Sequence, residues 1–152
     1  MKIRIRRQTV LIAIVLVVGS VLAHLYVEAQ TYHPVLKVAT PEGFVYTVVQ
    51  TATADRNACG KANDRFLEPL KAGCKECKVE FARCERTLSG RELAISMGES
   101  GDNHMIVAFG LHMAMRGPAE KIKSVCDKFA LDMVRSGLPT AACVYPRHKP
   151  AG

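Results

Sequence analysis

The chain has 152 residues, with 21 Lys and Arg against 14 Asp and Glu, and a net charge of +7. The first 29 positions hold four of the basic residues and one acid, so the remainder has 17 basic and 13 acidic residues, a net charge of +4. Basic side chains there stand beside acids and form no aromatic-interleaved stripe, which excludes nucleic acid as a partner. The roughly 120 residues that follow suffice for one domain and not two.

The N-terminus has the pattern of a membrane anchor. Residues 1–9 carry four basic side chains and no acid, and the 18 residues 10–27 (VLIAIVLVVGSVLAHLYV) are apolar almost throughout. A helix of that length spans roughly 27 Å, close to the hydrocarbon thickness of a bilayer. The positive-inside rule keeps residues 1–9 in the cytoplasm. We therefore expect a single-pass protein of the inner (cytoplasmic) membrane, with residues 10–27 in the lipid bilayer and an extracytoplasmic, periplasmic C-terminal domain.

A cleaved signal peptide is the alternative, which would secrete the domain into the periplasm. The stretches before Ala23 and Ala29 both offer the small residues that signal peptidase needs. Against cleavage, apolar character continues to Val27, beyond the usual signal core, and Tyr26 stands where an interfacial aromatic anchor would. On either route the six cysteines reach a compartment where disulfides form and persist.

Two segments flank the domain, which we place at residues 44–146. Residues 28–43 contain Pro34 and Pro41 and have the composition of an extended linker. Residues 147–152 predict a disordered tail. No internal repeat is visible in the sequence.

The first predicted elements are a strand, a helix and a second strand. Residues 44–50 (FVYTVVQ) are aromatic or β-branched, typical of a buried strand. Thr53 or Asp55 can cap the helix that follows, and Pro69 and then Gly73 end it. Its apolar positions recur every three or four residues, at Cys59, Ala62, Phe66 and Leu70. Residues 78–85 (KVEFARCE) alternate in polarity and predict the second strand.

The second part of the domain repeats this alternation of elements. Ser89 and Glu92 form a capping box for a short helix. Residues 105–116 predict one long strand that places on one face Val107, Phe109, Leu111, Met113 and Met115. A second long helix opens at Gly117-Pro118 and ends at Gly137. Its apolar stripe comprises Ile122, Val125, Cys126, Phe129 and Met133. Residues 141–145 predict a last short strand.

The resulting order, β-α-β-(short α)-β-α-β, predicts an α+β fold. Two β-α-β units with right-handed crossovers favour a ferredoxin-like split β-α-β sandwich, with a four-stranded sheet ordered 4-1-3-2 and both long helices on one face. A flavodoxin-type open sheet is the rival, but four strands and two long helices are too few for it. Such a scaffold does not by itself imply a function.

Six cysteines allow fifteen connectivities, which the predicted topology narrows. It brings Cys59, near the start of the first helix, to Cys84, near the end of the second strand. Cys126 on the second helix can face Cys143 on the strand that follows. Cys74 and Cys77 remain as the third pair, at the opposite end of the sheet.

The Cys74–Cys77 pair also fits a redox-active CxxC motif. That chemistry needs the first cysteine at a helix N-terminus, whereas here the pair follows a helix C-terminus. We therefore interpret it as a structural bridge and keep thiol-disulfide or metal handling by Cys74 and Cys77 as the alternative function. Zinc is not expected, since four ligands at suitable spacing are missing.

Few other side chains suggest chemistry. Arg83, Arg86 and Arg91 near the end of the second strand are the best candidates for binding an anion, against a charged edge that discourages strand pairing. His104, His112 and the neighbouring methionines could suit Cu(I), but strand alternation separates them. No hydrolase motif is present. We therefore expect no enzymatic activity, no metal and no cofactor.

The whole chain, a basic cytoplasmic N-terminus, one helix, a linker and a small α+β domain, looks like the bitopic accessory subunits of bacterial envelope machines. This resemblance of architecture implies a non-enzymatic assembly, adaptor or ligand-sensing component of a bacterial cell-envelope complex, with a protein partner in the envelope. The sequence does not specify the oligomeric state.

Overall fold

The computed structural model describes residues 15–20 and 31–146, so most of residues 1–30 and the whole tail 147–152 lie outside the described residues. Residues 15–20 are helical. None of the helices described is long and apolar enough to cross a membrane. The membrane anchor at residues 10–27 therefore stays a prediction.

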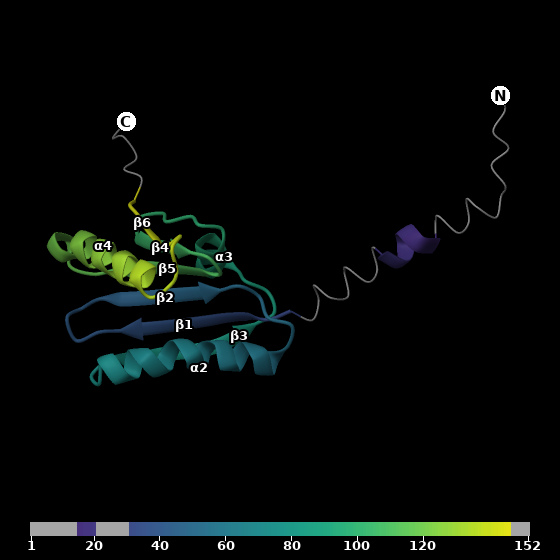
Figure 1. The fold of residues 1–152 in the computed structure, drawn as a ribbon, viewed down its shortest axis with the longest axis horizontal. Coiled ribbons are helices and arrows are strands. Elements are labelled where there is room, and N and C mark those ends of the chain that lie inside the picture. Colours follow the sequence, from purple (N-terminus) through teal and green to yellow (C-terminus); the bar gives the residue numbers. More distant parts are fainter. Residues whose placement is uncertain (1–14, 21–30, 147–152) are drawn as a thin grey trace, which may run out of the picture.

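The domain has an α+β fold built on one antiparallel sheet of six strands, ordered β3-β1-β2-β5-β4-β6 (Figure 1). The strands are β1 His33–Ala39, β2 Val45–Gln50, β3 Lys78–Glu85, β4 His104–Ala108, β5 Leu111–Arg116 and β6 Ala142–Val144. The helices are α2 Arg56–Gly73, α3 Gly90–Ser96 and α4 Ala119–Arg135. Asp55 caps α2, because its carboxylate accepts a hydrogen bond from the Ala58 N–H at 2.8 Å.

The fold consists of two similar halves. The first half is β1-β2-α2-β3 and the second half is β4-β5-α4-β6, with α3 between them. In each half the first strand lies in the middle, flanked by the other two. The halves join through the antiparallel pairing of β2 with β5, from Val45 opposite Arg116 to Gln50 opposite Leu111. The fold thus repeats a ββαβ unit although the sequence shows no repeat.

The prediction that residues 28–43 form a linker is wrong for β1, which lies inside the sheet between β2 and β3. Val35, Leu36 and Val38 are completely buried there. The two prolines suggested a linker because proline is rare inside strands. Pro34, however, stands near the start of β1, where the missing N–H is tolerated.

The long strand expected over residues 105–116 is instead the hairpin β4–β5. Gly110 has a φ of 77°, which lets the chain reverse at Phe109 and Gly110. Phe109 is therefore 87% exposed at the tip rather than part of the core. The reversal also places Val107 on the opposite face from Met113 and Met115.

These two extra strands overturn the ferredoxin-like order. In that order, the strand between the two parallel strands of one β-α-β unit comes from the other unit. Here β1 occupies that place between β2 and β3, and β4 occupies it between β5 and β6. Each half supplies its own middle strand, so the halves lie side by side.

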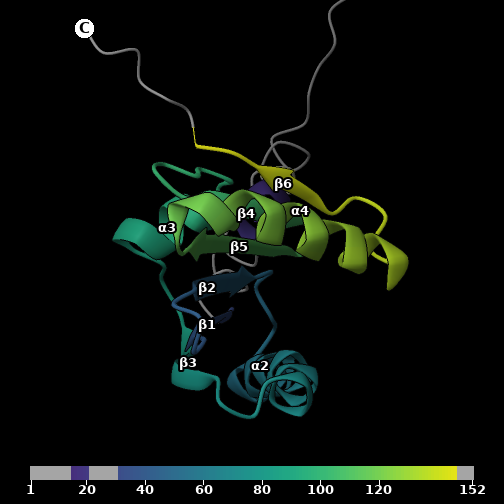
Figure 2. The ribbon, with the colours of Figure 1, turned by 90° about the vertical axis from the view of Figure 1, so that its left-hand side faces the viewer.

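Helices cover both faces of the sheet. The two long helices α2 and α4 pack on one face, against strand residues that include Leu36, Val48, Ile106 and Met113. The short helix α3 packs on the other face through Ile95. The long helices are not aligned: Figure 2 shows α2 nearly end-on while α4 runs across the view.

Candidate functional site

Two disulfides fasten the long helices to the outermost strands. Cys59 of α2 is bonded to Cys84 of β3, with Cα atoms 6.0 Å apart. Cys126 of α4 is bonded to Cys143 of β6, with Cα atoms 5.7 Å apart. Each half thus holds its helix to its edge strand in the same way. These are the two pairs that the topological argument expects.

The third bridge joins Cys74 to Cys77 just after α2, with Cα atoms 5.4 Å apart. Cys74 is the C-cap of α2, and its N–H donates to the Leu70 carbonyl at 2.8 Å. The negative end of the helix dipole disfavours a thiolate at this position. All six cysteines lie among the described residues, and each is in one of these three bridges. Three disulfides point to an oxidising, extracytoplasmic location.

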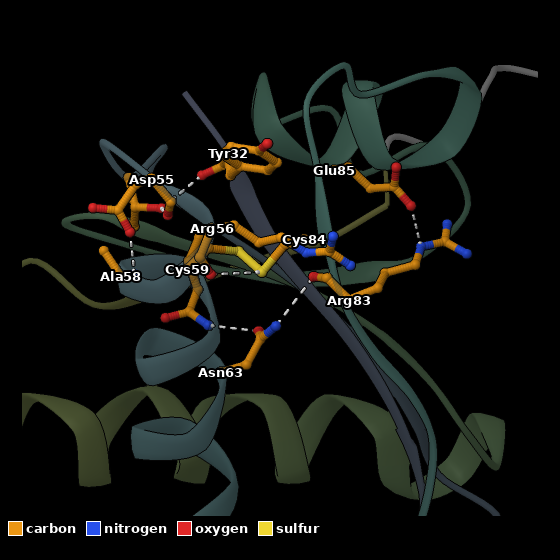
Figure 3. The surroundings of a disulfide bond; sticks show 11 residues. Tyr32, Asp55, Arg56, Ala58, Cys59, Asn63, Arg83, Cys84 and Glu85 are labelled. Atoms are coloured by element: carbon orange, nitrogen blue, oxygen red, sulfur yellow. Dashed lines mark hydrogen bonds and ion pairs between the residues drawn. A yellow bond between two sulfur atoms is a disulfide. The ribbon is translucent and has the colours of Figure 1, made fainter. Parts of the chain in front are cut away.

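A buried asparagine supports the Cys59–Cys84 bridge (Figure 3). The Asn63 side chain is 4% exposed, donates from Nδ2 to the Arg83 carbonyl at 3.1 Å and accepts from Gln50 Nε2 at 3.4 Å. Its amide therefore links α2 to β2 and β3. These hydrogen bonds are structural, since they are satisfied within the protein.

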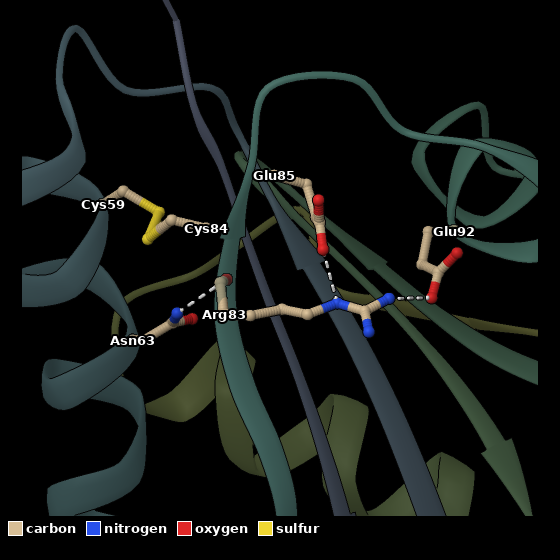
Figure 4. Close-up of polar contacts among 6 residues, drawn as sticks. All are labelled: Cys59, Asn63, Arg83, Cys84, Glu85 and Glu92. Carbon is tan, nitrogen blue, oxygen red and sulfur yellow. Dashed lines mark hydrogen bonds and ion pairs between the residues drawn. A yellow bond between two sulfur atoms is a disulfide. The ribbon is translucent and has the colours of Figure 1, made fainter.

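The three arginines proposed as an anion site contact different partners. The Arg83 guanidinium pairs with Glu85 at 2.7 Å and with Glu92 at 2.9 Å (Figure 4). Arg86 donates to the Tyr32 hydroxyl at 2.9 Å. The structure therefore does not bring these guanidinium groups together, and two carboxylates compensate the charge of Arg83.

Arg91 instead lies beside Arg116, a residue that the sequence analysis did not single out. Both guanidinium groups donate to Asn103 Oδ1, Arg91 at 3.2 Å and Arg116 at 2.8 Å. Burial and the positive charge of Arg116 lower the pKa of Arg91. Arg91 and Arg116 are far apart in the sequence, so the sequence alone does not reveal this pair. The two side chains meet because β5 ends near the turn that precedes β4.

The methionines belong to the core. Met113 and Met115 are buried under α2 and α4, and Met105 is buried on the face of α3. The His104 ring stands edge-on to Tyr145, with ring centroids 5.7 Å apart. Within residues 31–146 no group of three His, Cys, Asp or Glu residues could hold a metal ion.

A cleft with a volume of about 630 Å³ lies between α2 and α4. Phe66 and Leu70 of α2 line one side, and Phe129 and Met133 of α4 line the other. Tyr46 of β2 lies between them. Helical periodicity identifies these helix residues as inward-facing, but the cleft itself depends on how the two helices cross.

The rim of the cleft carries most of its polar groups. Glu42 lies in the turn between β1 and β2, and Arg65 lies on α2. The Cys74–Cys77 bridge also borders the cleft. Hydrogen bonds from its own backbone and from Thr40 lower the pKa of Glu42, so its carboxylate stays ionised at neutral pH.

Tyr46 is the polar group at the base of the cleft. It is 8% exposed, and its ring lies 6.4 Å from Phe44 and 6.2 Å from Phe129, between ring centroids. Its hydroxyl makes no hydrogen bond within the described residues, yet no side-chain polar atom sealed from solvent there lacks a partner. The hydroxyl is therefore accessible to solvent, and Tyr46 lines the cleft. Burial and the nearby Glu42 charge raise the Tyr46 pKa, so the hydroxyl keeps its proton.

The geometry thus offers an apolar cleft with one hydroxyl at its base and two opposite charges on its rim. Comparison with known proteins assigns the chain to no group: no protein-family model matches it, and neither do curated proteins or solved structures.

Proposed function

We propose that the chain is a membrane-tethered, extracytoplasmic binding domain that acts, without enzymatic activity, as a ligand-sensing or adaptor component of a bacterial cell-envelope complex. The observation that carries the proposal is the disulfide framework. Each long helix is fixed to the sheet by its own bridge, as suits a rigid domain in an oxidising compartment. The basic residues 1–9 and the apolar residues 10–27 support the tether.

The lining of the cleft supports binding over catalysis. Its hydroxyls are those of Thr40 and Tyr46, and no histidine lines it. The Thr40 hydroxyl donates a hydrogen bond to the Glu42 carboxylate, but the lowered pKa of Glu42 makes that carboxylate a poor general base at neutral pH. Apolar walls with few polar groups are typical of a ligand site.

Fractionation of bacteria that express the full chain tests the tether. We expect the protein in the membrane pellet after carbonate extraction, protected from external protease until the outer membrane is opened. A matched variant, Leu16→Arg with Val17→Arg, should leave the pellet because charge at a helix centre opposes insertion. A mature N-terminus at His24 or Gln30 would instead show that the segment is a cleaved signal.

Native gels of detergent-solubilised membranes test the role in a complex. We expect the 16.6 kDa chain to migrate in stoichiometric association with a second polypeptide. Migration of the wild-type chain alone, at its own mass, would contradict an adaptor role while leaving the tether intact.

Thiol-disulfide exchange through Cys74 and Cys77 is the second candidate, favoured by one observation: this bridge lies half-exposed on the rim of the cleft. Free-thiol counting after mild reduction decides between them. Selective reduction of Cys74 and Cys77 at the potential of glutathione would favour exchange, whereas resistance of all three bridges would favour the structural role.

A further inference from the structure

We propose that the cleft between α2 and α4 binds a small, neutral, largely apolar molecule whose polar end accepts a hydrogen bond from the Tyr46 hydroxyl. This ligand would be the molecule that the domain senses, so its biological role rests on the proposed ligand-sensing function.

The size and walls of the cleft determine the body of the ligand. Its volume of about 630 Å³ lies within the range of pockets for drug-sized molecules. Phe66, Leu70, Phe129 and Met133 are only partly buried, so each leaves apolar surface facing the cleft. A ring or a short acyl chain would cover that surface and release the water against it.

Tyr46 determines the polar end. Buried tyrosines normally satisfy their hydroxyl with a hydrogen bond, and this one has no such partner among the described residues. The hydroxyl is protonated and therefore a donor. An oxygen acceptor on the ligand, such as a carbonyl, would complete it in a low-dielectric setting where the bond is strong.

The rim determines the charge. Glu42 and Arg65 place one negative and one positive side chain beside the opening, and neither forms an ion pair with a described residue. The charges of Glu42 and Arg65 cancel, so these two side chains give the opening of the cleft no net charge. A charged ligand would gain attraction from one and repulsion from the other, and would lose its hydration, so a neutral molecule is favoured.

The disulfides keep the cleft open in the absence of ligand. One wall belongs to α2, fastened to β3 by Cys59–Cys84, and the other to α4, fastened to β6 by Cys126–Cys143. Because β3 and β6 are opposite edges of the sheet, neither helix can slide over Tyr46 without straining its bridge. A preformed site binds without the cost of ordering its walls.

Photolabelling of the full chain in lipid nanodiscs tests the proposal. The probe is benzophenone, a neutral apolar ketone that inserts into nearby C–H bonds on irradiation, and adducts are mapped by mass spectrometry. We expect saturable labelling on Met133 and Leu70. Labelling concentrated on Phe109, the exposed hairpin tip, or spread evenly over exposed apolar residues, would overturn the proposal.

Naphthalene derivatives of similar shape, added as competitors of the benzophenone labelling, test which chemical class the cleft prefers. We expect 2-acetylnaphthalene to protect the cleft better than 2-ethylnaphthalene, which lacks the acceptor, by about 2- to 10-fold, the worth of one net hydrogen bond. Tyr46→Phe should abolish that difference while the ethyl compound protects as before. The anion 2-naphthoate and the cation 2-naphthylmethylammonium should protect less, and stronger protection by either would overturn the neutral assignment.

A pair of variants on one helix completes the test. Met133→Glu puts a charge into the cleft and should reduce labelling of Leu70 at least tenfold. Leu131→Glu changes a side chain that is 48% exposed and does not line the cleft, and it should leave labelling unchanged. Circular dichroism and the absence of free thiols identify variants that are folded. Unaltered labelling in folded Met133→Glu would refute the site, whereas membrane fractionation would still report on the tether.

Discussion

His33 begins β1 and borders a hollow that it shares with His112 and Ser96. Burial lowers its pKa below the ordinary value of 6.5. Its cross-strand neighbour Glu85 cannot fully offset this, because that carboxylate already pairs with Arg83. The composition of residues 28–43 assigned His33 to a linker, but its position in the sheet buries it and lowers its pKa.

The consequence is a pH-dependent stability. As the pH falls below 6.5 toward the lower folded pKa, the unfolded chain binds a proton that the folded chain does not, so the free energy of unfolding decreases. Well above pH 6.5 His33 is unprotonated in both states and adds no pH dependence. Urea unfolding at pH 7.5 and pH 5.5 should show a smaller decrease for His33→Gln than for the wild type. Equal decreases would contradict a proton-linked role for His33.

Phe129 lies at the centre of the apolar stripe of α4 and packs on Tyr46. Phe129→Ala should lower the free energy of unfolding by about 2 kcal/mol, less than for a fully buried phenylalanine because the ring also borders the cleft. Lys128→Ala, one position round the helix, should change it by less than about 0.5 kcal/mol. Denaturant titration compares the two, and similar losses would mean that the helix face is misassigned.

At this scale the sequence predicts side-chain orientation better than side-chain partners. The α4 stripe follows from helical periodicity, and Ile122, Cys126 and Phe129 do pack on the sheet. That the Tyr46 hydroxyl has no protein partner among the described residues could not be foreseen, since it depends on which side chains α2 and α4 place beside it. The Arg91–Arg116 pair likewise requires knowledge of where β5 ends.

Among the elements, β3 is predicted to the residue, and the bounds of β2 and α4 differ little from expectation. The missed elements share a cause. Prolines and polar residues masked the core positions of β1, and uninterrupted alternation concealed the turn at Gly110. The local pattern of polar and apolar residues indicates which secondary structure a segment can form. Pairing with neighbouring strands decides where a strand ends.

The expected cysteine pairs nevertheless occur, although the strand order behind them is wrong. Each long bridge closes within one β-α-β unit, and those units are the part of the topology that the sequence predicts correctly. The identity of the strand in the middle of each unit does not alter the distance between its helix and its outer strand.

The bridges should differ in their contribution to stability. Replacing Cys126 and Cys143 by alanine opens a loop with a sequence separation of 17 and should cost about 3 kcal/mol. Replacing Cys74 and Cys77 opens a separation of only 3 and should cost clearly less. Thermal unfolding of both double variants measures the difference. A larger loss for the short bridge would contradict the entropic account.

For the whole molecule, the two ββαβ halves leave β3 and β6 as the edges of the sheet and place the cleft near the β2–β5 seam. The candidate ligand site therefore draws its walls from both halves. This explains why the sequence, which reveals each helix separately, identifies the apolar helix residues of the cleft without revealing that they enclose a space.

The order of the bridges along the chain bears on how the protein matures after translocation. Cys74 and Cys77 pair with each other inside the loop closed by Cys59 and Cys84, so the first cysteine to cross the membrane must wait for the fourth. An oxidant that joins cysteines as they emerge would bond Cys59 to Cys74. Correct pairing then requires thiol-disulfide reshuffling, a slow step that isomerases catalyse.

We therefore expect the yield of native protein to fall in cells that lack a disulfide isomerase in the extracytoplasmic compartment where the chain folds. The variant Cys74→Ala with Cys77→Ala should escape that dependence, because its remaining cysteines pair in order of emergence, Cys59 with Cys84 and Cys126 with Cys143. Non-reducing gels of protein from both strains provide the measurement. Equal isomerase dependence of the two proteins would show that folding precedes oxidation, so that the sheet itself selects the partners.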